Sequence, residues 1–245
     1  PLSYVVIGCI DVEEPDVSDL VLGFREPIAD ERNALVEIEL AIAAIKNKEK
    51  WNDFSWWEKE VLGYGTPIER KDWGQILTEN EEALSLLDRA LLKSEFYVEH
   101  NFSVKDRCPY IDSISLHKLL SLRVIQQVEK GEWQGAMSDL KSTKKLPDLI
   151  YQSDDTLVAA LIAIALEHSR FSAVEYILCN SDLNEPQLTE LLTVVDRNTT
   201  GLHEMMTRTM KAEFTTSMNT IKEIAGGEYE GYSSLAFYFH ENRTI

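Results

Sequence analysis

The chain has 245 residues, of which 44% are hydrophobic, so it is long enough to bury a core as one domain or as two closely packed halves. It carries 24 Lys and Arg residues against 42 Asp and Glu residues, and the net charge of -18 argues against a nucleic-acid partner because phosphate backbones would be repelled. The three cysteines lie far apart in the sequence, which excludes a CxxC metal knuckle and a disulfide framework.

Residues 1–29 are expected to form an irregular arm or tether outside the folded domain. The segment VVIGC, residues 5–9, resembles the lipobox of bacterial lipoproteins, in which the cysteine becomes the lipid-bearing first residue. Cys9 is therefore a candidate lipid anchor, and the acidic, proline-containing chain after it suits a solvated tether. Alternatively, SYVVIGCI forms a β-strand or a buried extended segment, which its β-branched residues favour. Both hypotheses stay open.

Residues 30–225 are expected to form a helical domain, because the hydrophobic residues recur at helical spacing from residue 30 onward. The first predicted helix has Asp30 as its N-cap, and its apolar face consists of Leu35, Ile38, Ile42 and Ile45.

Further helices are predicted along the rest of this domain, bounded by glycine, proline and capping residues. They run from about residue 52 to the GYGTP turn, and then over 78–93, 112–130, 133–145, 154–180, 185–196 and 201–224. The segment 95–109 has no sustained period and is predicted to be a long loop. The aromatic-rich tail 226–245 ends without a capping signal, so we expect the natural chain to continue beyond it.

The stretch VIQQVEKGEWQGAMSDL predicts two amphipathic helices joined by a glycine, as in a tetratricopeptide (TPR) hairpin. The residues that fit the TPR pattern are Gly131, Trp133, Ala136, Met137, Leu140 and Pro147. Gly131 is expected to have a positive φ, which is costly for other residues. A weaker copy in ALEHSRFSAVEYIL lacks the turn glycine and is equally compatible with one long helix. The predicted fold is all-α: antiparallel helical hairpins in a short TPR-like array with an irregular N-terminal arm.

Several segments carry a resemblance to a known family. They are EPDVSDLVL with REPIADERNALVEIELAIAAI, NEEALSLLDRAL, LRVIQQVEKGEWQGAMSDL and LVAALIAIALEHSRFSAVEYIL. Together they resemble an uncharacterised family of α-helical, TPR-like bacterial envelope proteins, over most of the chain from residue 15 to about residue 244. The resemblance implies a bacterial cell envelope or periplasmic location, with the cytoplasm as the alternative. It implies no activity, substrate or catalytic residue.

No motif in the sequence predicts catalysis or metal binding. The five histidines form no HExxH pair or close His/Cys/Asp set, and GxSxG does not occur. We therefore expect no cofactor, no metal and no catalytic residue, and we expect Cys179 to be a small buried hydrophobic residue. A hydrolase that uses His100 and Cys108 in the segment 95–109 is kept as an alternative.

The predicted function is a non-enzymatic interaction module for a protein or peptide partner at the cell envelope, because stacked helix pairs leave a groove. Contact with a membrane is expected only through the N-terminal anchor. The residues predicted to contact the partner are Trp56, Trp73, Arg123 and Trp133. A second alternative is a glycan- or small-ligand-binding protein that uses the Trp-rich region 51–73.

Overall fold

The computed structural model of the chain describes residues 26–47, 73–100, 108–153, 156–195 and 199–226. Every regular element within these ranges is an α-helix, so the all-α prediction is confirmed. Cys9, Trp56 and the helix predicted from about residue 52 lie outside the described residues, as do most of the predicted arm and tail.

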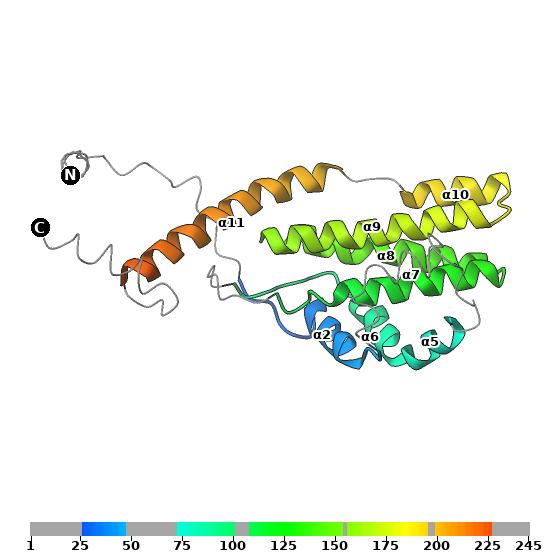
Figure 1. Cartoon of the computed structure of the whole chain (residues 1–245), viewed down its shortest axis with the longest axis horizontal. Helices are drawn as coiled ribbons and strands as arrows, with labels where there is room; N and C mark the ends of the chain where they lie inside the picture. The colour runs from blue at the N-terminus through cyan, green and yellow to red at the C-terminus, as the bar shows by residue number, and fades with distance from the viewer. Residues whose placement is uncertain (1–25, 48–72, 101–107, 154–155, 196–198, 227–245) are drawn as a thin grey trace, which may run out of the picture.

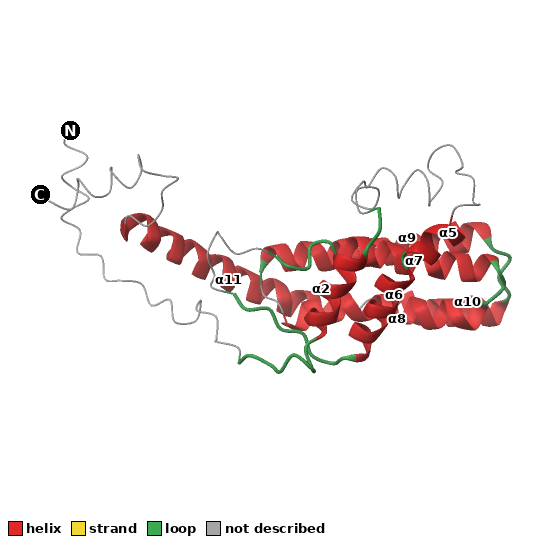
Figure 2. Ribbon diagram, turned by 90° about the horizontal axis from the view of Figure 1, so that it is seen from below, coloured by secondary structure: helices red, strands yellow, loops and turns green. Residues whose placement is uncertain are grey.

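The described helices form a bundle built around three long helices. In chain order they are α2 (Ala34–Ala44), α5 (Trp73–Glu79), α6 (Glu81–Leu92), α7 (Ser113–Glu129), α8 (Trp133–Ser153), α9 (Leu157–Asn180), α10 (Glu185–Val195) and α11 (Thr199–Gly226). Helices α7, α8 and α9 lie side by side, and each contacts the other two (Figure 1). The shorter helices α2, α5 and α6 cover α7 (Figure 2), whereas α10 and α11 pack on α8 and α9.

The core has two parts that follow this arrangement. The larger part is built from α2, α5, α6, α7, α8 and α9, with Met205 added from α11. The smaller part lies among α7, α8, α9 and α10 and consists of Val124, Ala136, Met137, Leu140, Val174, Ile177, Leu191 and Val194. This smaller part packs between the α7–α8 turn and the α9–α10 turn at one end of the bundle. It therefore fixes how α10 lies against α7 and α8.

The N-cap of α2 is Asn33, so the prediction of Asp30 is wrong. The Asn33 side-chain oxygen accepts from the backbone N–H of Leu35 at 3.1 Å and from that of Tyr97 at 3.0 Å. Its amide also donates to the Tyr97 carbonyl at 3.0 Å. Asn33 is buried. Leu35 lies only two residues away in the sequence, whereas Tyr97 lies 64 residues away, so the sequence alone does not reveal the second contact. The contact with Tyr97 therefore selects the cap.

Helix α5 was not predicted, and it contains Thr78, which was expected to open the next helix. The Thr78 hydroxyl donates to the Gly74 carbonyl at 2.8 Å within α5, and α6 begins only after Asn80. Asn80 is 1% exposed; its side chain accepts from the Lys46 N–H at 2.8 Å and donates to the Ile76 carbonyl at 2.9 Å. Asn80 thus ties the end of α2 to α5 and sets the boundary.

Helix α8 continues to Ser153 with Pro147 inside it, so the predicted end at residue 145 is wrong. Proline has no N–H, which leaves the carbonyl of Thr143, four residues earlier, without its helical donor. His117 on α7 supplies a donor instead, with its Nε2 at 2.9 Å from that carbonyl. A tertiary hydrogen bond therefore offsets the bond that the proline removes.

Helix α9 is continuous from Leu157 to Asn180, so ALEHSRFSAVEYIL forms one long helix and not a second hairpin. Within the described ranges, α9 is the helix whose length and composition would allow it to cross a bilayer, with a mean hydropathy of 1.5. Of its apolar window, 56% is buried inside the bundle. Its buried face also carries Ser169 and Arg170, which is consistent with a core helix.

Candidate functional site

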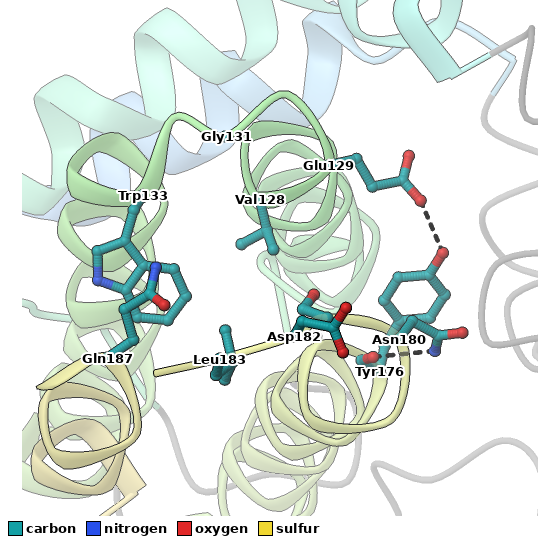
Figure 3. Close-up of a pocket in the computed structure, with 10 residues that line it drawn as sticks. Val128, Glu129, Gly131, Trp133, Tyr176, Asn180, Asp182, Leu183 and Gln187 are labelled. Atoms are coloured by element: carbon teal, nitrogen blue, oxygen red, sulfur yellow. Dashed lines mark hydrogen bonds between the residues drawn. The ribbon is translucent and has the colours of Figure 1, made fainter. Parts of the chain in front are cut away.

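A pocket of about 530 Å³ lies where the α7–α8 turn and the α9–α10 turn meet (Figure 3). This volume is within the roughly 300–1,000 Å³ that is common for ligand sites. The residues that line it are Val128, Glu129, Gly131, Trp133, Tyr176, Asn180, Ser181, Asp182, Leu183 and Gln187. Figure 3 shows Trp133 and Gln187 on one side and Glu129 with Tyr176 on the other.

The first wall is held by a glycine-dependent helix end. Gly131 has a φ of +77°, which confirms the predicted positive φ. Its N–H donates to the Val128 carbonyl at 3.0 Å, and the N–H of Glu132 donates to the Gln127 carbonyl at 2.8 Å. These two bonds make a Schellman motif, which satisfies the last carbonyls of α7 and turns the chain into α8.

Trp133, one of the predicted partner-binding residues, is the first residue of α8 and reaches the pocket from this turn. Its Nε1 donates to Glu190 of α10 at 2.8 Å, and the other Glu190 oxygen lies 3.5 Å from Lys141. The indole also packs against the smaller part of the core. The ring is therefore held in one orientation with part of its surface on the pocket.

The second wall is the α9–α10 turn, which is closed by a reciprocal pair of hydrogen bonds. The Asn184 side chain accepts from the Gln187 N–H at 3.0 Å, and the Gln187 side chain accepts from the Asn184 N–H at 3.0 Å. This capping box starts α10 and fixes the turn that carries Asp182. Asp182 is exposed, and no residue that the structure describes forms a hydrogen bond or ion pair with its carboxylate.

Tyr176 joins the two helices that form the far side of the pocket. Its hydroxyl donates to Glu129 of α7 at 2.8 Å. Its ring meets Trp73 edge to face, with the ring centroids 6.1 Å apart. The Asn180 amide donates to the Tyr176 carbonyl at 2.9 Å, one turn along α9. Contacts between helices therefore hold Tyr176 and Glu129 in place, whereas Asp182 lies exposed on the turn.

The histidine with the most perturbed pKa lies away from this pocket, in the core. Burial lowers the pKa of His117 from 6.5 to about 4, with Arg170 nearby acting in the same direction and the Thr143 hydrogen bond opposing it. Because the side chain is 1% exposed, it acts as a neutral hydrogen-bond donor in the core. In the described part of the chain, no three His, Cys, Asp or Glu side chains are placed to hold a metal ion.

Arg123, also predicted to contact a partner, joins three helices within the chain. Its guanidinium donates to Asp139 at 2.7 and 2.9 Å and to Asp88 at 2.9 and 2.8 Å. Burial lowers the pKa of Arg123, but the hydrogen bonds and charges of these two aspartates outweigh it and raise the pKa above its usual value. Arg123 therefore holds α6, α7 and α8 together, and its contact with a partner stays a prediction.

The other residues singled out in the sequence are spread over the molecule. Trp73 is 3% exposed and supports Tyr176 from the core, so the structure gives it a packing role, and its partner contact stays a prediction. Cys108 packs partly buried against the larger part of the core, and the segment between it and His100 lies outside the described residues. Cys179 is exposed, which contradicts its predicted burial, because it lies on the opposite face of α9 from Ile177.

No protein-family model matches the sequence, and no curated protein or solved structure matches it. The resemblance to a bacterial envelope family stays a prediction. Of the pocket residues, Gly131 and Trp133 were predicted from the hairpin pattern in the sequence. Tyr176 and Asp182 were missed because no motif links them to the α7–α8 turn, and only the packing of α9 on α7 and α8 brings them there.

Proposed function

We propose that this chain is a non-enzymatic helical-repeat interaction module that holds a protein or peptide partner in the pocket between the α7–α8 and α9–α10 turns. The observation that carries the proposal is the pocket itself, in which Trp133 at the α7–α8 turn and Tyr176 near the end of α9 lie beside polar groups. Rigid aromatic anchors of this kind commonly provide most of the energy of a protein interface. The lining residues include no serine–histidine or cysteine–histidine pair that would favour covalent catalysis.

A TPR-like arrangement of these helices is part of the proposal. It is supported by the successive contacts of α7, α8 and α9, by the Gly131 turn, and by the complete burial of Ala136 on the second helix of the hairpin. Small residues at such positions let neighbouring helices approach closely. Repeat proteins bury one face of each hairpin against the next and bind partners with the exposed surfaces.

The proposed location is the bacterial cell envelope or periplasm, and it depends on the family resemblance of the sequence. An anchor through Cys9 would place the helical domain near a membrane, and the arm after it would act as a spacer. The net charge of -18 would repel anionic lipid surfaces and nucleic acid, so the helical domain is not expected to bind either of them. The partner is therefore expected to be a protein.

Site-specific photo-crosslinking tests the proposed binding site. A photoreactive amino acid replaces Ser181, which lines the pocket, and the matched control replaces the exposed Ser85 of α6. In cells that express the full-length protein at its native level, we expect a discrete protein adduct from position 181 and none from position 85. The same adducts from both positions, or no adduct from position 181, would contradict the proposal.

A further inference from the structure

The pocket between the α7–α8 and α9–α10 turns, called the Trp133 pocket below, is lined by groups that would attract a cation. Its described residues include two carboxylates, Glu129 and Asp182, and no lysine, arginine or histidine. The whole chain adds a long-range field of the same sign, with a net charge of -18. A positively charged group would therefore be attracted to the pocket, whereas an anionic group would be repelled.

The aromatic rings narrow the choice of cation. Trp133 and Tyr176 lie on opposite sides of the pocket, with Asp182 on the turn between them (Figure 3). A planar guanidinium can stack on an indole face and at the same time form two parallel hydrogen bonds with a carboxylate, which an ammonium group cannot do. Among the described residues, Asp182 has no hydrogen-bond or ion-pair partner. Both of its carboxylate oxygens can therefore accept hydrogen bonds from a guanidinium.

A second depression continues the surface beyond Asp182. It has a volume of about 470 Å³ and shares Ser181, Asp182 and Leu183 with the first pocket. Leu178 and Leu188 line it and are 51% and 40% exposed. An aliphatic side chain next to the basic one would therefore cover apolar surface that the chain leaves in water.

We propose that this double depression binds a basic peptide segment of the partner, with an arginine in the Trp133 pocket and a neighbouring aliphatic residue against Leu178 and Leu188. The inference rests on the proposed function and names the chemistry of the partner. The acceptor of the guanidinium is Asp182, and Trp133 is the ring on which it stacks. Glu129 is held by Tyr176 and contributes its charge to the same pocket.

Fluorescence anisotropy with dye-labelled octapeptides tests the inference on the full chain. Three peptides differ only in a central pair, which is Arg-Leu, citrulline-Leu or Asp-Leu. Citrulline has nearly the shape of arginine but no charge, so it separates charge recognition from fit. We expect the Arg-Leu peptide to bind about tenfold more tightly than the citrulline peptide, because a charge-assisted hydrogen bond is stronger than a neutral one. The Asp-Leu peptide is expected to bind more weakly than both.

The matched variants are Asp182→Asn in the pocket and Glu204→Gln on the exposed face of α11, because each removes one negative charge. Asp182→Asn should abolish most of the preference for arginine, whereas Glu204→Gln should keep it. Both residues are exposed, and urea unfolding checks that the two variants stay folded. Equal binding of the arginine and citrulline peptides, or a preference that survives Asp182→Asn, overturns the inference. If none of the peptides binds, the inference is also overturned, and the crosslink at Ser181 decides the proposed function separately.

Discussion

Lowering the pH is expected to destabilise the fold through His117, whose Nε2 donates to the Thr143 carbonyl at 2.9 Å in the core. Burial lowers the pKa of this imidazole from 6.5 to about 4, and Arg170 faces it as a further unfavourable charge. In the unfolded chain the same imidazole titrates near 6.5. Between these two values the unfolded state binds a proton that the folded state does not, so the free energy of unfolding falls as the pH falls.

The size of this effect follows from the two pKa values. One pKa unit corresponds to about 1.4 kcal/mol, so His117 alone should remove about 3 kcal/mol from the free energy of unfolding between pH 7 and pH 4. About 2 kcal/mol of this should be lost by pH 5. Because many domains have only about 5–15 kcal/mol of stability, such a loss would be easy to measure.

The assay is urea unfolding followed by circular dichroism at several pH values between about 7 and 5, for the parent chain and for His117→Gln. Glutamine keeps an N–H donor near the Thr143 carbonyl but does not titrate. The carboxylates titrate in both proteins, so the difference between the two curves isolates the histidine. We expect the parent chain to lose stability faster than the variant as the pH falls. Parallel curves would refute the assignment of His117 as a buried neutral donor.

Three other substitutions test the turn, the ion-pair network and the pocket wall. Gly131→Val places a β-branched residue at a φ of +77° and should lower the free energy of unfolding by about 1–3 kcal/mol in urea titrations. Gly131→Asn should cost less, and equal costs would contradict the backbone argument. Arg123→Met leaves two partly buried carboxylates without their cation and should cost about 2–3 kcal/mol, so an unchanged melting temperature would show that the network does not stabilise the fold. Trp133→Phe keeps an aromatic ring but loses the hydrogen bond to Glu190, so urea unfolding should show a free energy of unfolding lower by about 1 kcal/mol. Adding Glu190→Gln to this variant should lower the free energy of unfolding little further, because the bond is already lost.

The sequence predicts the helices well where the signals are local. The predicted ranges 112–130, 185–196 and 201–224 differ by at most two residues at either end from α7, α10 and α11. The turn glycine at residue 131 was also predicted, because a helix end with φ above zero favours glycine. In these segments the hydrophobic period and the capping residues agree, so little is left for distant contacts to decide.

The predicted helix ends are wrong where residues distant in the sequence determine the local structure. Asn33 caps α2 because Tyr97 holds it, and α8 passes through Pro147 because His117 reaches the carbonyl that the proline leaves free. Arg170 shows the same limit: it is 1% exposed, yet its guanidinium bonds to Glu167 and to the Val194 carbonyl near the end of α10. A single sequence contains these residues but not their spatial neighbours.

The candidate site shows how far sequence reasoning reaches on function. Trp133 was predicted from the hairpin pattern and lines the pocket. Tyr176 and Asp182 come from other parts of the chain, and neither has a motif that marks it. Arg123 was predicted to contact a partner because it lies beside the hairpin, but its guanidinium pairs with two aspartates of the same chain. Surface chemistry that depends on the assembly of three helices therefore needs the structure.

Nuclear magnetic resonance of the isotopically labelled full chain can show whether a basic peptide binds between the two turns. The reporter is the Trp133 indole N–H, which donates to Glu190. On addition of the Arg-Leu peptide, we predict a saturable shift of this signal and of the amides of residues 181–183, with the same Kd as the anisotropy measurement. Saturable shifts confined to α2 and α6, with the Trp133 signal unmoved, would contradict the claim.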